Sequence, residues 1–204
     1  MTYKIIVFVK NLKVGKVKTR LAASVGNQMA LRIYKALIQI TFTAISLSKA
    51  TKVIYMAEDL ETNTPFIPDS WSMKIQNGEN LGDRMAHAFS QELQQNNKAV
   101  LIGTDCPEIN DTLITKAFQA LDTYDVILGP AEDGGYYLIG LKSPKHALFE
   151  KIKWSTSSVL SETIGRCIAA NLTYFLLPTL SDLDVAEDLE KFPELLIACL
   201  KINQ

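Results

Sequence analysis

Thiol and imidazole side chains are scarce in this sequence, which contains three cysteines and two histidines among 204 residues. Cys106, Cys167 and Cys199 stand far apart without a Cys-x-x-Cys spacing, which excludes a disulfide framework and a cysteine-type zinc site. His87 and His146 are accompanied by no Gly-x-Ser-x-Gly motif, which argues against a serine or cysteine hydrolase triad. The cysteine usage fits a reducing compartment and predicts a cytoplasmic protein.

Excess charge and long apolar runs are absent as well. The formal net charge of −1 argues against a general nucleic-acid binder, because phosphate contacts need a surplus of lysine and arginine. No stretch approaches the ~20 apolar residues that cross a bilayer, and the apolar run near the start is too short for a signal peptide. With 48% hydrophobic and 21% charged residues, residues 1–204 are predicted to form a single domain.

What the sequence does contain is a buried strand that ends at an aspartate. Residues 99–107 read AVLIGTDCP, so four apolar residues run directly into a Gly-Thr-Asp-Cys-Pro turn. Ligands of open α/β sheets bind beyond the carboxyl ends of strands, which favours Asp105 as a metal ligand. The alternative is that Asp105 caps the next helix, but Asn110 and Asp111 are better placed for that role.

A basic loop follows the first predicted strand, residues 5–9. Residues 10–20 hold five of the 21 lysines and arginines, at the usual position of a phosphate-binding loop. Neither a Walker A motif nor Gly-x-Gly-x-x-Gly is present, and the alternative is a solvated run of charges. The predicted phosphate and nucleotide contacts are Lys10, Gly15, Lys16, Lys18, Thr19 and Arg20.

Two further segments carry candidate residues. In the turn at 76–85, Gly78 and Arg84 are candidates for nucleotide contact, although an ordinary loop and an ion pair explain them almost as well. Residues 129–140 read GPAEDGGYYLIG; Asp133 is a candidate general base or a turn cap. Gly134, Gly135 and Tyr136 are candidates for substrate contact by backbone and ring, the alternative being a plain hairpin turn.

The last third of the chain adds an aromatic residue and an acidic pair. Trp154 is either a packing residue or a substrate contact, and Ser155 is expected to cap the helix that follows. Asp182 and Asp184 alternate, so in an extended segment both point the same way and complete a metal site with Asp105. Their alternative role is to favour the start of the next helix.

Strand-like and helix-like segments alternate along the chain, which predicts an α/β fold. We expect a three-layer α/β/α sandwich with a mostly parallel central sheet, whose ligand-bearing loops share one edge. The basic loop and the acidic groups on that edge together predict a diphosphate site. A divalent ion, Mg²⁺ or Mn²⁺, is expected between Asp105, Asp182 or Asp184 and the phosphates, with Lys18 and Arg20 stabilising a departing phosphate.

Five segments carry a family resemblance that spans nearly the whole chain. They are residues 15–21 (GKVKTRL), 103–107 (GTDCP), 129–141 (GPAEDGGYYLIGL), 154–160 (WSTSSVL) and 181–189 (SDLDVAEDL). In this order they resemble the bacterial GT-A-type glycosyltransferases of the DUF2064 kind, assigned to arsenosugar biosynthesis or nucleotide-diphospho-sugar transfer. A more distant similarity runs to phospholactate guanylyltransferases, through Lys18-Thr19-Arg20 and Gly134-Gly135.

The resemblance implies a nucleotide-diphospho-sugar transferase (GT-A) fold, a divalent metal at Asp105 and nucleotide contacts from the loop after the first strand. Thr104, next to Asp105, is a further candidate for nucleotide contact. The leading hypothesis is a metal-dependent glycosyltransferase that uses a nucleotide-diphospho-sugar donor and a small-molecule acceptor. The alternative is a guanylyltransferase-like nucleotidyltransferase that moves a nucleoside monophosphate from an NTP to a small phosphorylated or carboxylated acceptor. A further alternative is a nucleotide-binding module without turnover. Nucleic-acid partners and a membrane span are not expected, and the oligomeric state is not predicted.

Overall fold

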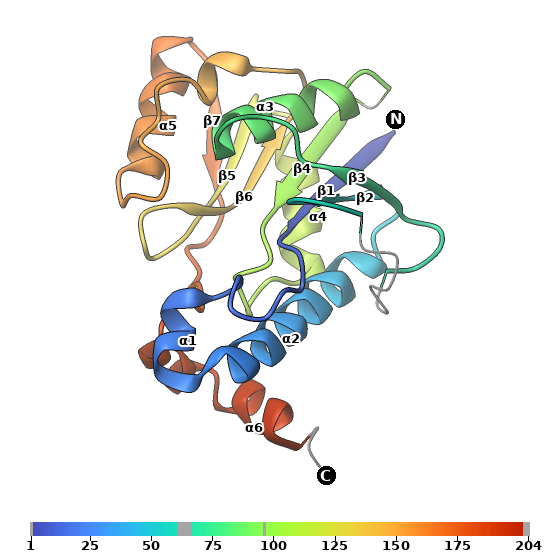
Figure 1. The fold of residues 1–204 in the computed structure, drawn as a ribbon. Helices are drawn as coiled ribbons and strands as arrows, with labels where there is room; N and C mark the ends of the chain where they lie inside the picture. Colours follow the sequence, from blue (N-terminus) through green and yellow to red (C-terminus); the bar gives the residue numbers. More distant parts are fainter. Residues whose placement is uncertain (1, 61–66, 96, 202–204) are drawn as a thin grey trace.

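A seven-stranded sheet in the order β3-β2-β1-β4-β6-β5-β7 forms the centre of the protein. The computed structural model describes residues 2–60, 67–95 and 97–201 (Figure 1). Neighbouring strands are parallel except that β6 runs antiparallel to β4 and β5, which confirms the mostly parallel sheet. The strands are β1 Tyr3–Val9, β2 Thr51–Met56, β3 Ser72–Ile75, β4 Lys98–Ile102, β5 Val126–Pro130, β6 Tyr136–Leu141 and β7 Tyr174–Leu176.

Helices cover both faces of the sheet, as the three-layer prediction requires. The helices α2 (Asn27–Ser46) and α4 (Asp111–Ala120) pack on one face, where they share an apolar cluster with inward residues of β1 and β4. The helices α3 (Leu81–Glu92) and α5 (Val159–Ala169) pack on the opposite face with the other side chains of the same strands. Both faces of the central strands are therefore buried, which explains their unbroken apolar sequences.

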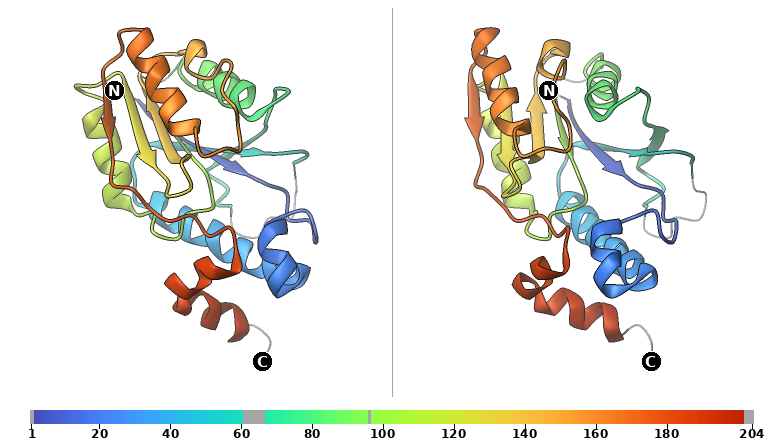
Figure 2. Two further views of the ribbon diagram at one scale, coloured as in Figure 1. Left: turned by 90° about the vertical axis from the view of Figure 1, so that its left-hand side faces the viewer. Right: turned by 60° about the vertical axis from the view of Figure 1, so that its left-hand side comes forward.

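A third apolar cluster lies beyond the edge of the sheet. It joins α1 (Thr19–Val25) and α2 to the 3₁₀ helix Ala186–Lys191 and to α6 (Pro193–Lys201). Figure 2 shows these C-terminal elements beside α1 and α2, away from β7, which is the strand that precedes them in the chain. The segment between β7 and α6 therefore returns to the carboxyl ends of β1 and β4.

The order of the strands creates a crevice between β1 and β4. β1 pairs with β2 on one side and with β4 on the other, all three in parallel. The connection from β1 to β2 runs through α2 on one face, whereas the connection from β3 to β4 runs through α3 on the other. Crossovers that leave in opposite directions open a crevice at the carboxyl ends of the two strands. Lys10 follows β1 there, and Gly103 follows β4.

The start of α5 differs from the sequence prediction. The helix begins at Val159 and is preceded by Ser158, so the expectation that Ser155 caps it is wrong. Ser155 instead has a left-handed backbone, with φ of 63°. The Ser158 hydroxyl donates to Glu162 Oε1 at 2.6 Å, and the Thr156 hydroxyl donates to the Lys153 carbonyl at 2.7 Å. These local hydrogen bonds favour a turn over an earlier helical start.

Asp125 offers a test of how β7 is held on the sheet. Its Oδ2 accepts hydrogen bonds from the Thr173 hydroxyl at 2.7 Å and the Thr173 amide at 2.9 Å, and Lys142 Nζ lies 3.2 Å from Oδ1. These partners lower the pKa of Asp125 to about 2. A depressed folded-state pKa stabilises the protein above the unfolded-state pKa, and this stability is lost as pH falls through the folded value.

We expect Asp125→Asn to lower the free energy of unfolding by about 1 kcal/mol at neutral pH. The difference from the wild type should shrink as the pH is lowered towards about 3, because the wild-type protein then loses the stability that its lowered Asp125 pKa provides at neutral pH. Urea unfolding over this pH range measures both effects. Asp69→Asn, at an exposed turn position, is the control and should leave stability unchanged. A pH-independent difference would contradict this account of Asp125.

Candidate nucleotide and metal site

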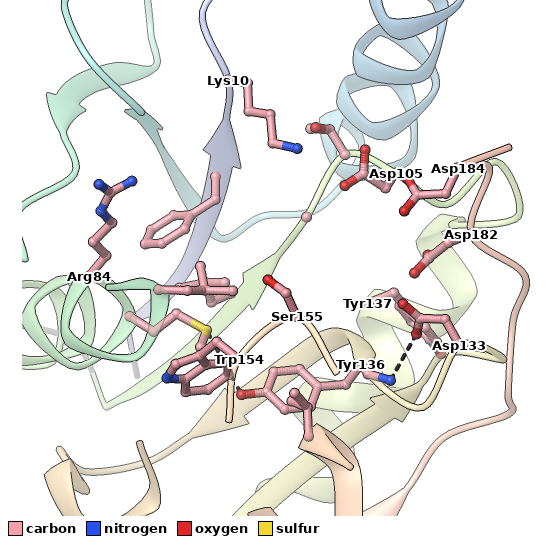
Figure 3. Close-up of a pocket in the computed structure, with 18 of the residues that line it drawn as sticks. Lys10, Arg84, Asp105, Asp133, Tyr136, Tyr137, Trp154, Ser155, Asp182 and Asp184 are labelled. Atoms are coloured by element: carbon pink, nitrogen blue, oxygen red, sulfur yellow. Dashed lines mark hydrogen bonds between the residues drawn. The ribbon is translucent and has the colours of Figure 1, made fainter. Parts of the chain in front are cut away.

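A cavity of about 550 Å³ opens at the carboxyl ends of β1 and β4. Its volume is in the range of pockets that enclose small-molecule ligands. Figure 3 shows Arg84 on one side of this pocket and the labelled aspartates on the opposite side. The pocket brings together eleven of the residues predicted from the sequence: Lys10, Arg20, Arg84, Thr104, Asp105, Asp133, Gly135, Tyr136, Trp154, Asp182 and Asp184.

The remaining predicted residues do not line the cavity: Gly15, Lys16, Lys18, Thr19, Gly78 and Gly134. Gly134 has a φ of 89°, and a Cβ there would lie 2.2 Å from the Ser157 carbonyl oxygen, so close backbone packing explains this glycine. Gly78 has a φ of 144°, and its carbonyl accepts from Arg84 Nε at 3.2 Å. Lys16 and Thr19 are exposed.

Lys18 is buried behind the pocket, where it joins three segments of the chain. Its side chain is 2% exposed, and Nζ lies 2.6 Å from Asp105 Oδ1 and 3.0 Å from Asp184 Oδ1. The same ammonium donates to the Leu183 carbonyl at 2.6 Å. Burial opposes its charge, yet the carboxylates of Asp105 and Asp184 raise the Lys18 pKa above its ordinary value. Lys18 therefore remains charged and holds the two carboxylates together.

The neighbouring carboxyl groups of Asp182 and Asp133 are compensated by less positive charge than those of Asp105 and Asp184, which contact Lys18. Burial raises the pKa of Asp182 to about 7, and the nearby carboxylates of Asp105 and Asp133 add to this effect. Asp133 Oδ1 accepts a hydrogen bond from the Gly135 amide at 2.8 Å, so this residue caps its turn while it also lines the cavity. Carboxyl groups thus accumulate on this side of the pocket, and their mutual repulsion makes Asp182 hold its proton more tightly than an ordinary aspartate.

A smaller hollow of about 260 Å³ adjoins the acidic side. It shares Arg20, Asp133, Asp182 and Asp184 with the main cavity. Arg20 Nη1 lies 3.4 Å from Asp184 Oδ2, and the Arg20 side chain is 73% exposed. An exposed arginine of this kind can turn from the carboxylate towards a phosphate that enters the pocket.

Tyr34 is a site residue that the sequence did not single out. Its hydroxyl accepts from the Lys10 amide at 2.8 Å and lies 3.0 Å from Thr104 Oγ1. Tyr34 thereby connects the ends of β1 and β4 at the base of the cavity, although only 1% of it is exposed. The available signal was a tyrosine hydroxyl on the apolar face of α2, because a buried hydroxyl needs a partner.

The opposite side of the pocket is apolar and aromatic. Trp154 and Tyr136 line it together, and both pack against the apolar cluster under α3 and α5. Trp154 lies directly against α3: a Cβ on Gly82 would be 2.6 Å from Trp154 Nε1. Gly82 is a second residue whose role was missed, because nothing in its sequence neighbourhood points to Trp154. Trp154 therefore both packs and faces the cavity.

A divalent ion would need more ligands than the predicted aspartates supply alone. The residues at 2–60, 67–95 and 97–201 contain no group of three or more His, Cys, Asp or Glu side chains arranged to hold a metal ion. Asp105 and Asp184 each already contact Lys18. Magnesium commonly uses one or two carboxylates together with phosphate oxygens and water. Asp105, together with Asp182 or Asp184, offers carboxylate oxygens that fit this partial role.

The sequence belongs to a bacterial family. The profile described as "Uncharacterized protein conserved in bacteria (DUF2064)" matches residues 40–156. The chain is a member of the DUF2064 family. This confirms the resemblance seen in its motifs. A provisionally assigned nucleotide-diphospho-sugar transferase from Desulfovibrio desulfuricans G20 is 32% identical, with a TM-score of 0.84 over 91% of this chain and 84% of that chain.

More distant solved structures share the fold of this DUF2064 protein. The inositol-1-phosphate CTP transferase from T. maritima is 13% identical, with a TM-score of 0.58 over 97% of this chain and 96% of that one. Rv0371C of Mycobacterium tuberculosis H37Rv, in complex with manganese, is 10% identical, with a TM-score of 0.57 over 95% and 99% of the two chains. None of the curated proteins matches. The nucleotide-diphospho-sugar transferase fold is thus confirmed.

The described part of the chain contains no helix with the length and apolar character that a membrane span requires.

Gly82 provides a test of the aromatic side of the pocket. We expect Gly82→Ala to lower stability by about 1–3 kcal/mol, because the new methyl group would overlap Trp154 and the Phe149 carbonyl, 2.7 Å away. The tryptophan fluorescence should shift as the indole moves. Gly165→Ala, in α5 with nothing within 4 Å of the added Cβ, is the matched control. It should gain about 0.5–1 kcal/mol from helix propensity. Equal effects of the two substitutions would contradict the close packing of Trp154.

Proposed function

We propose that this protein is a divalent-metal-dependent glycosyltransferase that binds a nucleotide-diphospho-sugar in the 550 Å³ cavity. The observation that carries the proposal is the distribution of charge around this single cavity. Asp105, Asp133 and Asp182 line one side, and the cationic side chains of Lys10 and Arg84 line the same cavity from other elements. A metal-bound diphosphate carries both kinds of charge and matches this lining.

The related proteins support this assignment. The Desulfovibrio protein, provisionally assigned as a nucleotide-diphospho-sugar transferase, matches most of the chain at 32% identity. A protein of the same fold was solved with manganese. A fold hosts several reactions, so the assignment depends on the residues of the pocket and not on the fold alone.

In the proposed reaction, the phosphates lie near the ends of β1 and β4. Lys10 and Arg20 bind phosphate oxygens, and Thr104 offers a hydroxyl at the base of the cavity. Arg84 and the rings of Trp154 and Tyr136 hold other parts of the donor. Asp105, together with Asp182 or Asp184, would hold a divalent ion, which when bound supplies positive charge to the leaving diphosphate. Lys18 acts indirectly, because its ammonium contacts Asp105 and Asp184 and not the cavity.

The acceptor approaches from the smaller hollow in this proposal. Asp133 lies where the two hollows meet, and the Gly135 amide fixes its carboxylate through Oδ1. From this position Asp133 accepts the proton of the acceptor hydroxyl while the hydroxyl oxygen attacks the sugar carbon. The hydrogen bond from Gly135 orients the carboxylate and limits its rotation before reaction.

A nucleotidyl transfer is the second candidate, and a specific observation favours it. Solved proteins with the same fold include a CTP transferase from T. maritima. The same cavity would then hold an NTP, and pyrophosphate would leave in place of a nucleoside diphosphate. The exposed Arg20 could bind the additional phosphate.

Product analysis separates these reactions. The protein is incubated with nucleotide sugars or with NTPs, in the presence of Mg²⁺ or Mn²⁺ and a mixture of small hydroxylated acceptors. Release of a nucleoside diphosphate from a nucleotide sugar supports glycosyl transfer, and release of pyrophosphate from an NTP overturns it in favour of nucleotidyl transfer. Thermal shift with each nucleotide detects binding directly, because a ligand of the folded state raises the melting temperature. Binding with neither product would indicate a module without turnover.

Asp133→Asn tests the proposed base. We expect kcat/KM to fall by about 10²–10⁴-fold, with the nucleotide affinity nearly unchanged, because the amide cannot accept the proton. Asp69→Asn is the matched control: it makes the same chemical change at an exposed turn position that lines neither hollow. It should keep most of the activity. A similar loss in both variants, or none in Asp133→Asn, would rule out Asp133 as the base.

A further inference from the structure

Lys18 occupies the space between two of the carboxylates that the sequence predicts as metal ligands. Its Nζ lies 2.6 Å from Asp105 Oδ1 and 3.0 Å from Asp184 Oδ1. A divalent ion bound by these same two oxygen atoms would take the position of the ammonium. An ammonium and a metal ion cannot both occupy this position.

We propose that Lys18 is an internal cation that holds the metal position at Asp105 and Asp184 while the nucleotide is absent. The ammonium and a divalent ion compete for these oxygens, and the phosphate oxygens of a bound nucleotide shift this competition in favour of the ion. Lys18 is thus a positioning residue that couples metal binding to nucleotide binding. This inference rests on the proposed use of a divalent metal.

The surroundings of Lys18 explain why it competes effectively. Its side chain is 2% exposed, and the Leu183 carbonyl, 2.6 Å away, satisfies another of its protons. A buried ammonium with three oxygen partners is held in place in a way that an exposed lysine is not. By contrast, Arg20 is 73% exposed and contacts Asp184 only at 3.4 Å, so it can leave that carboxylate.

The expected size of the competition follows from Coulomb's law. A divalent ion about 4 Å from an ammonium loses more than ten-fold in affinity even at the dielectric constant of water, and more in a partly buried site. Phosphate oxygens add negative charge beside the ion and offset this repulsion. The wild type is therefore expected to bind free metal ions weakly and nucleotide-bound ones well.

Manganese binding without nucleotide tests the proposal. Free Mn²⁺ is measured by electron paramagnetic resonance during titration of the full chain. Lys18→Gln removes the charge but keeps an amide that can donate to the Leu183 carbonyl, and it should bind Mn²⁺ at least about ten-fold more tightly than the wild type. Lys16→Gln, which removes an exposed charge from the same loop, is the control and should change the affinity less than two-fold. Unchanged or weaker binding in folded Lys18→Gln would overturn the proposal.

A second measurement uses the wild type and decides the matter if Lys18→Gln does not fold. Acetic anhydride modifies accessible lysine amines, and peptide mass spectrometry reports each site. Lys18 should be protected in the metal-free protein and become acetylated at saturating Mn²⁺, whereas Lys16 should react in both states. Continued protection of Lys18 would mean that the ion does not displace it. Neither measurement includes a nucleotide, so failure here is distinct from failure of the proposed transfer reaction.

Discussion

The buried ion pairs of Lys18 are the interaction on which the geometry of the pocket depends. One ammonium contacts Asp105, which follows β4, and both Leu183 and Asp184, which lie in the C-terminal segment. Lys18 and Leu183 are 165 residues apart in the sequence. Removing an ammonium from water is unfavourable unless oxygen acceptors replace the water molecules. The buried position of Lys18 is therefore stable only when Asp105, Leu183 and Asp184 all supply their oxygen atoms. The backbone adds a direct connection, because the Leu183 amide donates to the Asp105 carbonyl at 2.9 Å.

This arrangement divides the acidic residues into two groups. Asp105 and Asp184 are compensated by Lys18, and the pKa of Asp184 is lowered despite its burial. Asp182 is surrounded by other carboxylates, and its pKa is raised to about 7. One cavity is therefore lined by a carboxyl group with a raised pKa, Asp182, and by one with a lowered pKa, Asp184, a pattern typical of functional sites. The same arrangement places ionised and protonatable carboxyl groups opposite the cationic and aromatic lining.

Part of the site was predictable because of where the strands end. The apolar runs at β1 and β4 identify buried parallel strands, and their carboxyl ends lie at one edge, so Lys10 and Asp105 were expected to be close. Ser155 was misassigned because hydrogen bonds of Thr156 and Ser158 delay the helix. The role of Gly82 depends on Trp154, which is distant in the sequence and touches it only in the folded chain.

The sequence alone determined the α/β class, the mostly parallel sheet and the edge at which the candidate residues gather, because these follow from local apolar patterns and turns. Only the tertiary structure decided which charged groups pair. Lys18 and Lys16 look alike in a basic loop, yet one is buried between carboxylates and the other is exposed. The reason is that the pairing depends on the return of the C-terminal segment to β1 and β4, which packing of α6 against α2 brings about over a long separation in the chain.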